Sequence, residues 1–154
     1  MRMKNRWLIL GGVLSFAVAL LHVVMIFIGA PAYRYFGAGE DMATAAESGS
    51  AFPALLTLFL AGIFAIWGFY GLSGAGVIWR LPLLKIALIL IGAIYTLRGV
   101  AVFQQLFQIA TSSVEVAPRE IVFSLVSLVI GLAYLIGTIS NWKSFGANNR
   151  NVQT

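Results

Sequence analysis

Four long apolar runs, separated by polar segments, dominate the hydrophobic pattern of this chain. They cover residues 7–29, 52–74, 83–104 and 119–140. A helix needs roughly 20 mostly apolar residues to cross a bilayer core about 30 Å thick, and each run has that length. None alternates apolar and polar residues with period two, so helices are predicted and not barrel strands. The sequence predicts an all-α integral membrane protein, a four-helix bundle with up-down-up-down topology.

The segments outside the runs complete a single transmembrane domain, predicted over residues 1–154. The outer loop, residues 30–51, contains Glu40–Glu47, which predicts a short interfacial helix with acids in its first turn and a Ser-Gly-Ser stop. Residues 104–108 are amphipathic, so the third helix is expected to continue into the interface. Residues 144–154 form a polar, asparagine-rich tail for which disorder is predicted.

Charged side chains divide between the two predicted sides of the membrane. One side carries Arg2, Lys4, Arg6, Arg80, Lys85, Lys143 and Arg150 and no acid. The other side carries Glu40, Asp41, Glu47, Glu115 and Glu120, together with Arg34, Arg98 and Arg119. Because basic residues are enriched on the cytoplasmic side of membrane proteins, both termini are predicted to be cytoplasmic and the loop at residues 30–51 to lie outside.

Composition excludes several classes of function. Sixty per cent of the residues are hydrophobic and 10% are charged, and the net charge of +5 gathers at helix ends, so no nucleic-acid partner is predicted. The chain has no cysteine and one histidine, which removes disulfides, thiolate metal sites and an intrachain bis-histidine haem. No phosphate-binding glycine motif, HExxH motif or intramembrane carboxylate pair occurs. No metal, cofactor or catalytic residue is therefore predicted, and the protein is expected not to be an enzyme.

Two ionisable side chains inside the runs, His22 and Arg98, are the candidates for chemistry. Such groups are costly within a span and are functional hypotheses by default. At a rise of 1.5 Å per residue, His22 lies about 12 Å below the end of its run, close to the levels of Arg98 and Ser127. The candidate polar layer comprises His22, Tyr95, Arg98, Glu120, Ser124 and Ser127. Two questions stay open. Arg98 either snorkels to the headgroups or pairs with Glu120. His22 is either part of a functional site or a hydrogen-bonded structural residue.

The outer loop supplies a second set of candidates. Its aromatic and charged residues Tyr33, Arg34, Glu40 and Asp41 are candidates for binding outside the membrane. The favoured interpretation of the loop itself is a solvated segment with a helical turn, and the alternative is a lid or partner-docking element.

Three short segments carry a resemblance. They are Gly29–Glu40, with the sequence GAPAYRYFGAGE, Arg80-Leu81-Pro82, and Tyr95–Gly99, with the sequence YTLRG. With the four-run architecture, they make the chain similar to small uncharacterised bacterial proteins with four membrane helices. The resemblance implies a bacterial inner (cytoplasmic) membrane location. It implies no activity and transfers no catalytic residue.

The leading functional hypothesis is a non-enzymatic, multi-pass membrane component. Besides the lipid bilayer, it is expected to bind a partner, a lipid headgroup or a small ligand on its outer side, as a homodimer or with another membrane protein. One alternative is a small transporter or channel with an outer-half cavity at Arg98 and His22. A second alternative is a membrane enzyme that acts on a lipid or quinone through His22.

Overall fold

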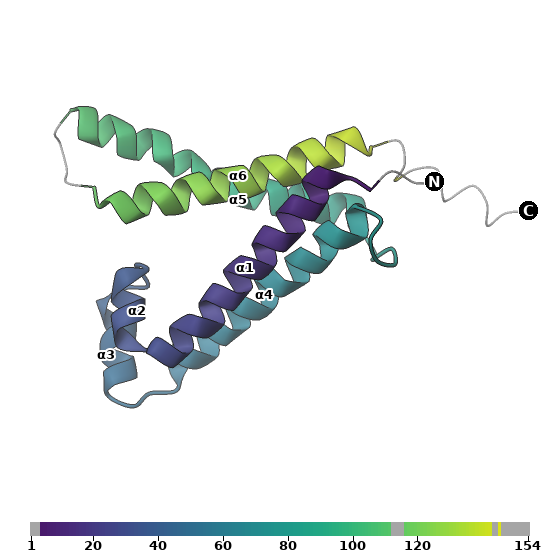
Figure 1. Ribbon diagram of the computed structural model, residues 1–154. Coiled ribbons are helices and arrows are strands. Elements are labelled where there is room, and N and C mark those ends of the chain that lie inside the picture. Colours follow the sequence, from purple (N-terminus) through teal and green to yellow (C-terminus); the bar gives the residue numbers. More distant parts are fainter. Residues whose placement is uncertain (1–3, 112–115, 143–144, 146–154) are drawn as a thin grey trace, which may run out of the picture. The chain divides into compact units, whose positions relative to one another are not determined.

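All regular secondary structure in the described part of the chain is α-helical. The computed structural model describes residues 4–111, 116–142 and 145 (Figure 1). The helices are α1 (Arg6–Ile28), α2 (Ala30–Tyr35), α3 (Glu40–Glu47), α4 (Phe52–Gly74), α5 (Leu84–Ala110) and α6 (Pro118–Ser140). Glu115 and, apart from Phe145, the tail predicted to be disordered lie outside the described residues. The predicted all-α class is confirmed.

Four of the helices, α1, α4, α5 and α6, are long and apolar enough to cross a membrane. Three of them have 23 residues and α5 has 27. At 1.5 Å per residue each is about 35 Å or longer, which exceeds the roughly 30 Å of a bilayer core. The protein is an integral membrane protein with four apolar helices, as predicted.

The third spanning helix, α5, is longer than its apolar run. It continues past Gln104 to Ala110, so residues 104–108 are helical, as their amphipathic pattern indicates. At its end, the hydroxyl of Thr111 donates to the carbonyl of Phe107 at 2.9 Å. The backbone N–H of Thr111 donates to the same carbonyl at 3.0 Å, so Thr111 caps the end of α5 through both groups.

The loop between α1 and α4 contains two short helices. The predicted helix Glu40–Glu47 is present as α3, with Glu40 and Asp41 in its first turn. The second helix, α2, was not predicted, because Pro31 after an apolar run indicates the end of a helix. Gly29 explains the difference: its φ of +76° turns the chain sharply, and Pro31 then lies in the first turn of a new helix, where proline is well tolerated. We refer to residues 30–47, which hold α2 and α3, as the cap.

The chain divides into two compact units. Unit 1 consists of Met1–Val13 and Phe69–Thr154, and unit 2 consists of Leu14–Gly68. Helices α1 and α4 therefore contribute residues to both units. The single transmembrane domain stays a prediction.

Close helix packing in unit 1 depends on small residues. Helices α5 and α6 lie side by side and antiparallel (Figure 1). A Cβ atom placed on Gly99 of α5 would lie 2.4 Å from the backbone nitrogen of Leu128 in α6. A Cβ on Gly131 of α6 would lie 2.4 Å from Thr96 Oγ1 in α5. Only glycine lets the two backbones approach this closely without a clash, as is common where helices pack in membranes.

Hydrogen bonds tie several helix ends together at one end of unit 1. The Asn5 amide oxygen accepts from the backbone N–H groups of Trp7 and Leu8, which caps the start of α1. Its amide nitrogen donates to the carbonyl of Gly137 in α6 at 2.9 Å. Asn141 just after α6 donates to the carbonyl of Gly74 at the end of α4, at 3.4 Å. We call this region, residues 4–8, 73–85 and 137–142, the basic end.

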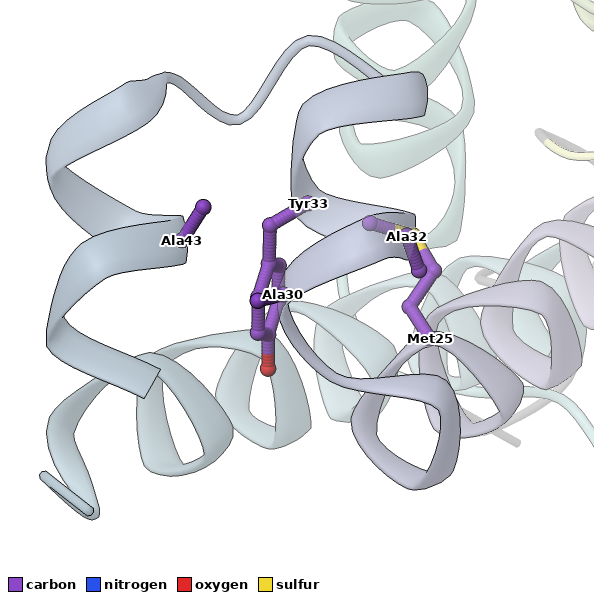
Figure 2. Packing of buried hydrophobic residues seen from close by; sticks show 5 residues of the cluster. All are labelled: Met25, Ala30, Ala32, Tyr33 and Ala43. Carbon is purple, nitrogen blue, oxygen red and sulfur yellow. The ribbon is translucent and has the colours of Figure 1, made fainter. Parts of the chain in front are cut away.

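In unit 2, residues of α1 and α4 pack against each other and the cap forms its own small core. The ring of His22 in α1 lies 4.8 Å, centroid to centroid, from the ring of Phe64 in α4. The core of the cap is shown in Figure 2. Its buried members are Met25, Ala30, Ala32, Tyr33 and Ala43, with Phe36, Met42 and Ala46 packed against them.

Candidate functional site

The most extensive polar contacts among the described side chains centre on Arg34 in the cap. Its Nε donates to both carboxylate oxygens of Glu40, at 3.1 and 3.0 Å, and its Nη2 donates to Glu40 Oε1 at 2.7 Å. Nη1 and Nη2 donate to the two oxygens of Glu47, at 2.6 and 3.1 Å. The guanidinium of α2 is thus shared between the first and last residues of α3. We call Arg34, Glu40 and Glu47 the Arg34 clamp.

These contacts shift the pKa values of all three groups. Hydrogen bonds to Glu40 and then Glu47 raise the pKa of the Arg34 guanidinium above its ordinary value. Hydrogen bonds from Arg34 hold the pKa of the Glu40 carboxyl and that of the Glu47 carboxyl below their ordinary values. All three side chains are solvent-exposed, so water screens the clamp. It links two short helices and keeps its charges at neutral pH.

Tyr33 is the largest buried side chain in the core of the cap. The side chain of Tyr33 is 1% exposed, and Ala43 of α3 is fully buried. Figure 2 shows the Tyr33 ring between α2 and α3, with Ala43 on the facing side. Tyr33 was a binding candidate, but its ring joins the two helices and presents little surface to a ligand.

Asp41 lies in the first turn of α3 and is exposed. Its negative charge is favourable there, because the N-terminus of a helix carries a partial positive charge. The ion pairs among the described residues are those of Arg34 with Glu40 and Glu47, so Asp41 forms none. Of the outer-loop candidates, Asp41 is the one whose charge is most available to a partner.

Glu47 belongs to the clamp but was missed as a site residue. It follows Glu40 by two helical turns, so both carboxylates project from one face of α3. A basic residue in the preceding short segment could have indicated the clamp, had α2 been recognised as a helix.

The intramembrane candidates of unit 1 lie along the contact between α5 and α6. Arg98 Nη1 donates to Ser124 Oγ at 3.5 Å, a long contact at the limit for a hydrogen bond. Ser127 donates to the carbonyl of Phe123 in its own helix, at 2.9 Å. Arg98 and Glu120 form no ion pair within the described chain. The structure therefore joins Arg98 to Ser124, one turn further along α6 than Glu120.

Other groups on α5 add polarity to the same region. Tyr95 stacks on Tyr134 of α6, with ring centroids 6.2 Å apart and planes 9° apart, and both rings are buried. Two buried side-chain oxygens, Thr96 Oγ1 and Gln105 Oε1, have no hydrogen-bond partner among the described residues. Buried side-chain oxygens normally accept or donate a hydrogen bond. Helix α5 therefore carries polar groups whose hydrogen-bonding capacity the described residues do not use.

His22 belongs to unit 2, whereas the other members of the predicted polar layer belong to unit 1. Its Nδ1 lies 2.8 Å from the carbonyl of Val18 in its own helix. Together with the ring contact to Phe64 in α4, this contact is typical of a histidine that packs between two helices. A joint layer of His22 and Arg98 stays a prediction.

Within the described residues, no group of three or more His, Asp or Glu side chains is arranged to hold a metal ion. The polar groups present can bind charge and donate or accept hydrogen bonds, at the exposed clamp of the cap and along the apolar helix α5. The chain is an integral, multi-pass membrane protein by the length and composition of its own helices. No family model, no curated protein and no solved structure matches it.

Proposed function

We propose that this protein is a non-enzymatic component of the bacterial inner membrane that binds a partner through its cap, on the outer side. One observation carries the proposal: the connection between α1 and α4 is a pair of helices with a buried core and the Arg34 clamp. A simple connection between two spans needs only a few residues. A segment that is ordered through its own contacts presents a preformed surface, which lowers the entropic cost of binding.

The charge of the cap favours a protein partner over a lipid headgroup or a small anion. The cap carries one basic side chain, Arg34, and three acidic ones, Glu40, Asp41 and Glu47. Its acidic surface would be repelled by anionic lipid headgroups. Tyr35 is 53% exposed at the end of α2 and adds an aromatic group of the type enriched at protein interfaces.

The predicted topology supports the outer location of this surface. In the described chain, the basic end carries Lys4, Arg6, Arg80 and Lys85 and no carboxylate. Under the positive-inside rule this end faces the cytoplasm, and both termini lie there. The acidic cap follows the opposite end of α1 and then lies outside.

Photo-crosslinking tests the proposal. A photoreactive residue at Thr44, which is exposed on α3, should give a discrete protein adduct in cells. The matched control is Phe59, which is 65% exposed on α4 within the span and should face lipid. The adduct should disappear in an Arg34→Gln background and persist in Arg119→Gln, which removes the same charge outside the cap. The proposal would be refuted if no adduct forms, no partner co-purifies, and the thermal stability of the protein is unchanged across a panel of lipids and metabolites.

A transporter or channel is the second candidate, and Arg98 favours it. The guanidinium lies in a membrane-spanning helix with one long hydroxyl contact and no carboxylate partner within the described chain. A positive charge of this kind could attract an anion. Anion flux in proteoliposomes should then be lost in Arg98→Leu and retained in Arg98→Lys, with equal folding. If proteoliposomes and liposomes without protein show the same anion flux, this candidate is excluded.

A further inference from the structure

A second surface lies at the basic end of unit 1, and we propose that it binds the headgroup of an anionic phospholipid. Its central groups are the guanidinium of Arg80, in the connection between α4 and α5, and the ammonium of Lys85, in the first turn of α5. The argument uses contacts within unit 1 alone and does not depend on the function proposed for the cap.

Lys85 is held in place by an aromatic ring. Its Nζ lies 3.2 Å from the ring centroid of Trp142, which follows α6. A cation over an indole face is attracted by the ring but keeps its hydrogens available for other acceptors. No described residue forms an ion pair with Lys85, and α5 has no acidic residue in its first turn. The ammonium is therefore positioned, and no described carboxylate neutralises its charge.

Arg80 is held by hydrogen bonds. Its Nη2 donates to the carbonyl of Phe145. The hydroxyl of Ser73 donates to the carbonyl of Trp79 and accepts from the N–H of Leu81, at 2.9 Å each, so the residues on both sides of Arg80 are fixed to the end of α4. The connection therefore presents a second ordered cation, five positions before Lys85 in the chain.

The surroundings of these cations match the headgroup layer of a bilayer. Trp79 is 75% exposed and Trp142 is 44% exposed, and indole rings favour the interface between hydrocarbon and water. Leu83, between the two cations in sequence, is 74% exposed. Because these apolar groups flank the ends of spanning helices, they lie where a lipid brings its phosphate and its acyl chains together. A lipid is therefore the occupant that satisfies both the charges and the apolar groups.

Fluorescence quenching in vesicles tests the inference. The reporter is the full-length chain with Trp142 as its single tryptophan, made by Trp7→Phe, Trp67→Phe and Trp79→Phe. It is reconstituted in phosphatidylcholine that contains equal small fractions of either brominated phosphatidylglycerol or brominated phosphatidylcholine. Stronger quenching by the phosphatidylglycerol indicates its enrichment beside Trp142.

Substitutions then assign the enrichment to the two cations. Arg80→Gln and Lys85→Gln should each lower the preference for phosphatidylglycerol about fivefold, the change expected for one basic residue at an anionic surface. Lys85→Arg should retain it, and Arg119→Gln, at the start of α6, should leave it unchanged. The preference is the ratio of the quenching by the two brominated lipids, measured in the same variant. A substitution that changes the fluorescence of Trp142 in general affects both values and cancels in the ratio.

Three outcomes would overturn the inference. The first is no preference for phosphatidylglycerol in the reporter chain. The second is an equal loss in Arg80→Gln, Lys85→Gln and Arg119→Gln, which would mean that only the net charge matters. The third is loss of the preference on addition of millimolar inorganic phosphate at constant ionic strength, which would mean that the site takes free phosphate.

Discussion

Arg34 Nη1 lies 2.6 Å from Glu47 Oε1, although the two residues are 13 positions apart in sequence. This contact joins the end of α2 to the end of α3, and the bonds to Glu40 hold the start of α3 to the same guanidinium. Bidentate contacts between arginine and carboxylate fix orientation as well as distance. The clamp therefore adds an orienting contact between the two helices to the packing of Tyr33 between them.

Arg34→Gln should loosen the cap without unfolding the spanning helices. The substitution removes the charge and the fork of donors that both carboxylates share, and it leaves two like charges facing each other. Hydrogen exchange of the amides in residues 40–47 should become faster, and exchange in α5 and α6 should not change. Exchange in residues 40–47 that matches the unsubstituted chain would show that the exposed clamp adds nothing measurable.

Tyr33→Ala should destabilise the cap more than the loss of the clamp. Tyr33 is 1% exposed and fills the space between α2 and α3, and truncation of a buried aromatic side chain costs about 3–5 kcal/mol. Protection of residues 30–47 from hydrogen exchange should largely disappear. Tyr35→Ala is the control: that ring is 53% exposed, so the change should stay within about 0.5 kcal/mol.

The clamp should also make the cap sensitive to acid. Both carboxyl pKa values are lowered by hydrogen bonds from Arg34, so the folded cap favours the ionised forms. The clamp's contribution is therefore present above the ordinary carboxyl pKa of about 4.3 and is lost as the pH falls through the lowered folded values. Exchange of residues 40–47, corrected for its intrinsic pH dependence, should stay slow from pH 7 to 5 and rise in more acidic solution. Glu47→Gln should weaken this acid dependence, whereas opening between pH 7 and 5 would contradict the assignment.

Much of the fold could be predicted because the thickness of the bilayer sets the minimum length of an apolar helix that crosses it. The four spans follow from runs of about 20 apolar residues. Helix α3 follows from its acidic first turn and its Ser-Gly-Ser end. Helix α2 could not be predicted in this way, since a proline after an apolar run is compatible with the end of one helix and the start of the next. The positive φ of Gly29 shows that a new helix starts here, and this angle is known only once the backbone has folded.

The candidate sites were less predictable, since side-chain contacts across helices depend on rotation as well as depth. Depth along the helices suggested Glu120 for Arg98, whereas the contact is with Ser124. The bond from Asn5 to the carbonyl of Gly137 crosses 132 residues and has no local sequence signal. Arg34, Glu40 and Asp41 could be selected because charged residues in a short outer loop are few.

Gly99→Ala should weaken the pairing of α5 with α6. The added Cβ would lie 2.4 Å from the backbone nitrogen of Leu128 and 2.5 Å from its Cα, and backbone atoms cannot move aside as a flexible side chain can. Overpacking of this kind costs about 1–3 kcal/mol. Thermal unfolding in detergent should show the loss. Gly62→Ala in α4 is the matched control, since nothing lies within 4 Å of its new Cβ; it should cause no loss of stability, and equal losses in both variants would contradict the packing argument.

Single-cysteine labelling in intact bacterial cells should establish the orientation on which the functional proposal depends. The chain has no cysteine, so each variant carries one thiol. Ser48→Cys, at the exposed end of α3, should react with a membrane-impermeant maleimide from outside, because the acidic cap is expected there. Val77→Cys, 42% exposed in the connection that carries Arg80, should react only after permeabilisation. The reverse result would turn the cap toward the cytoplasm, and a cytoplasmic protein would then be the partner to seek.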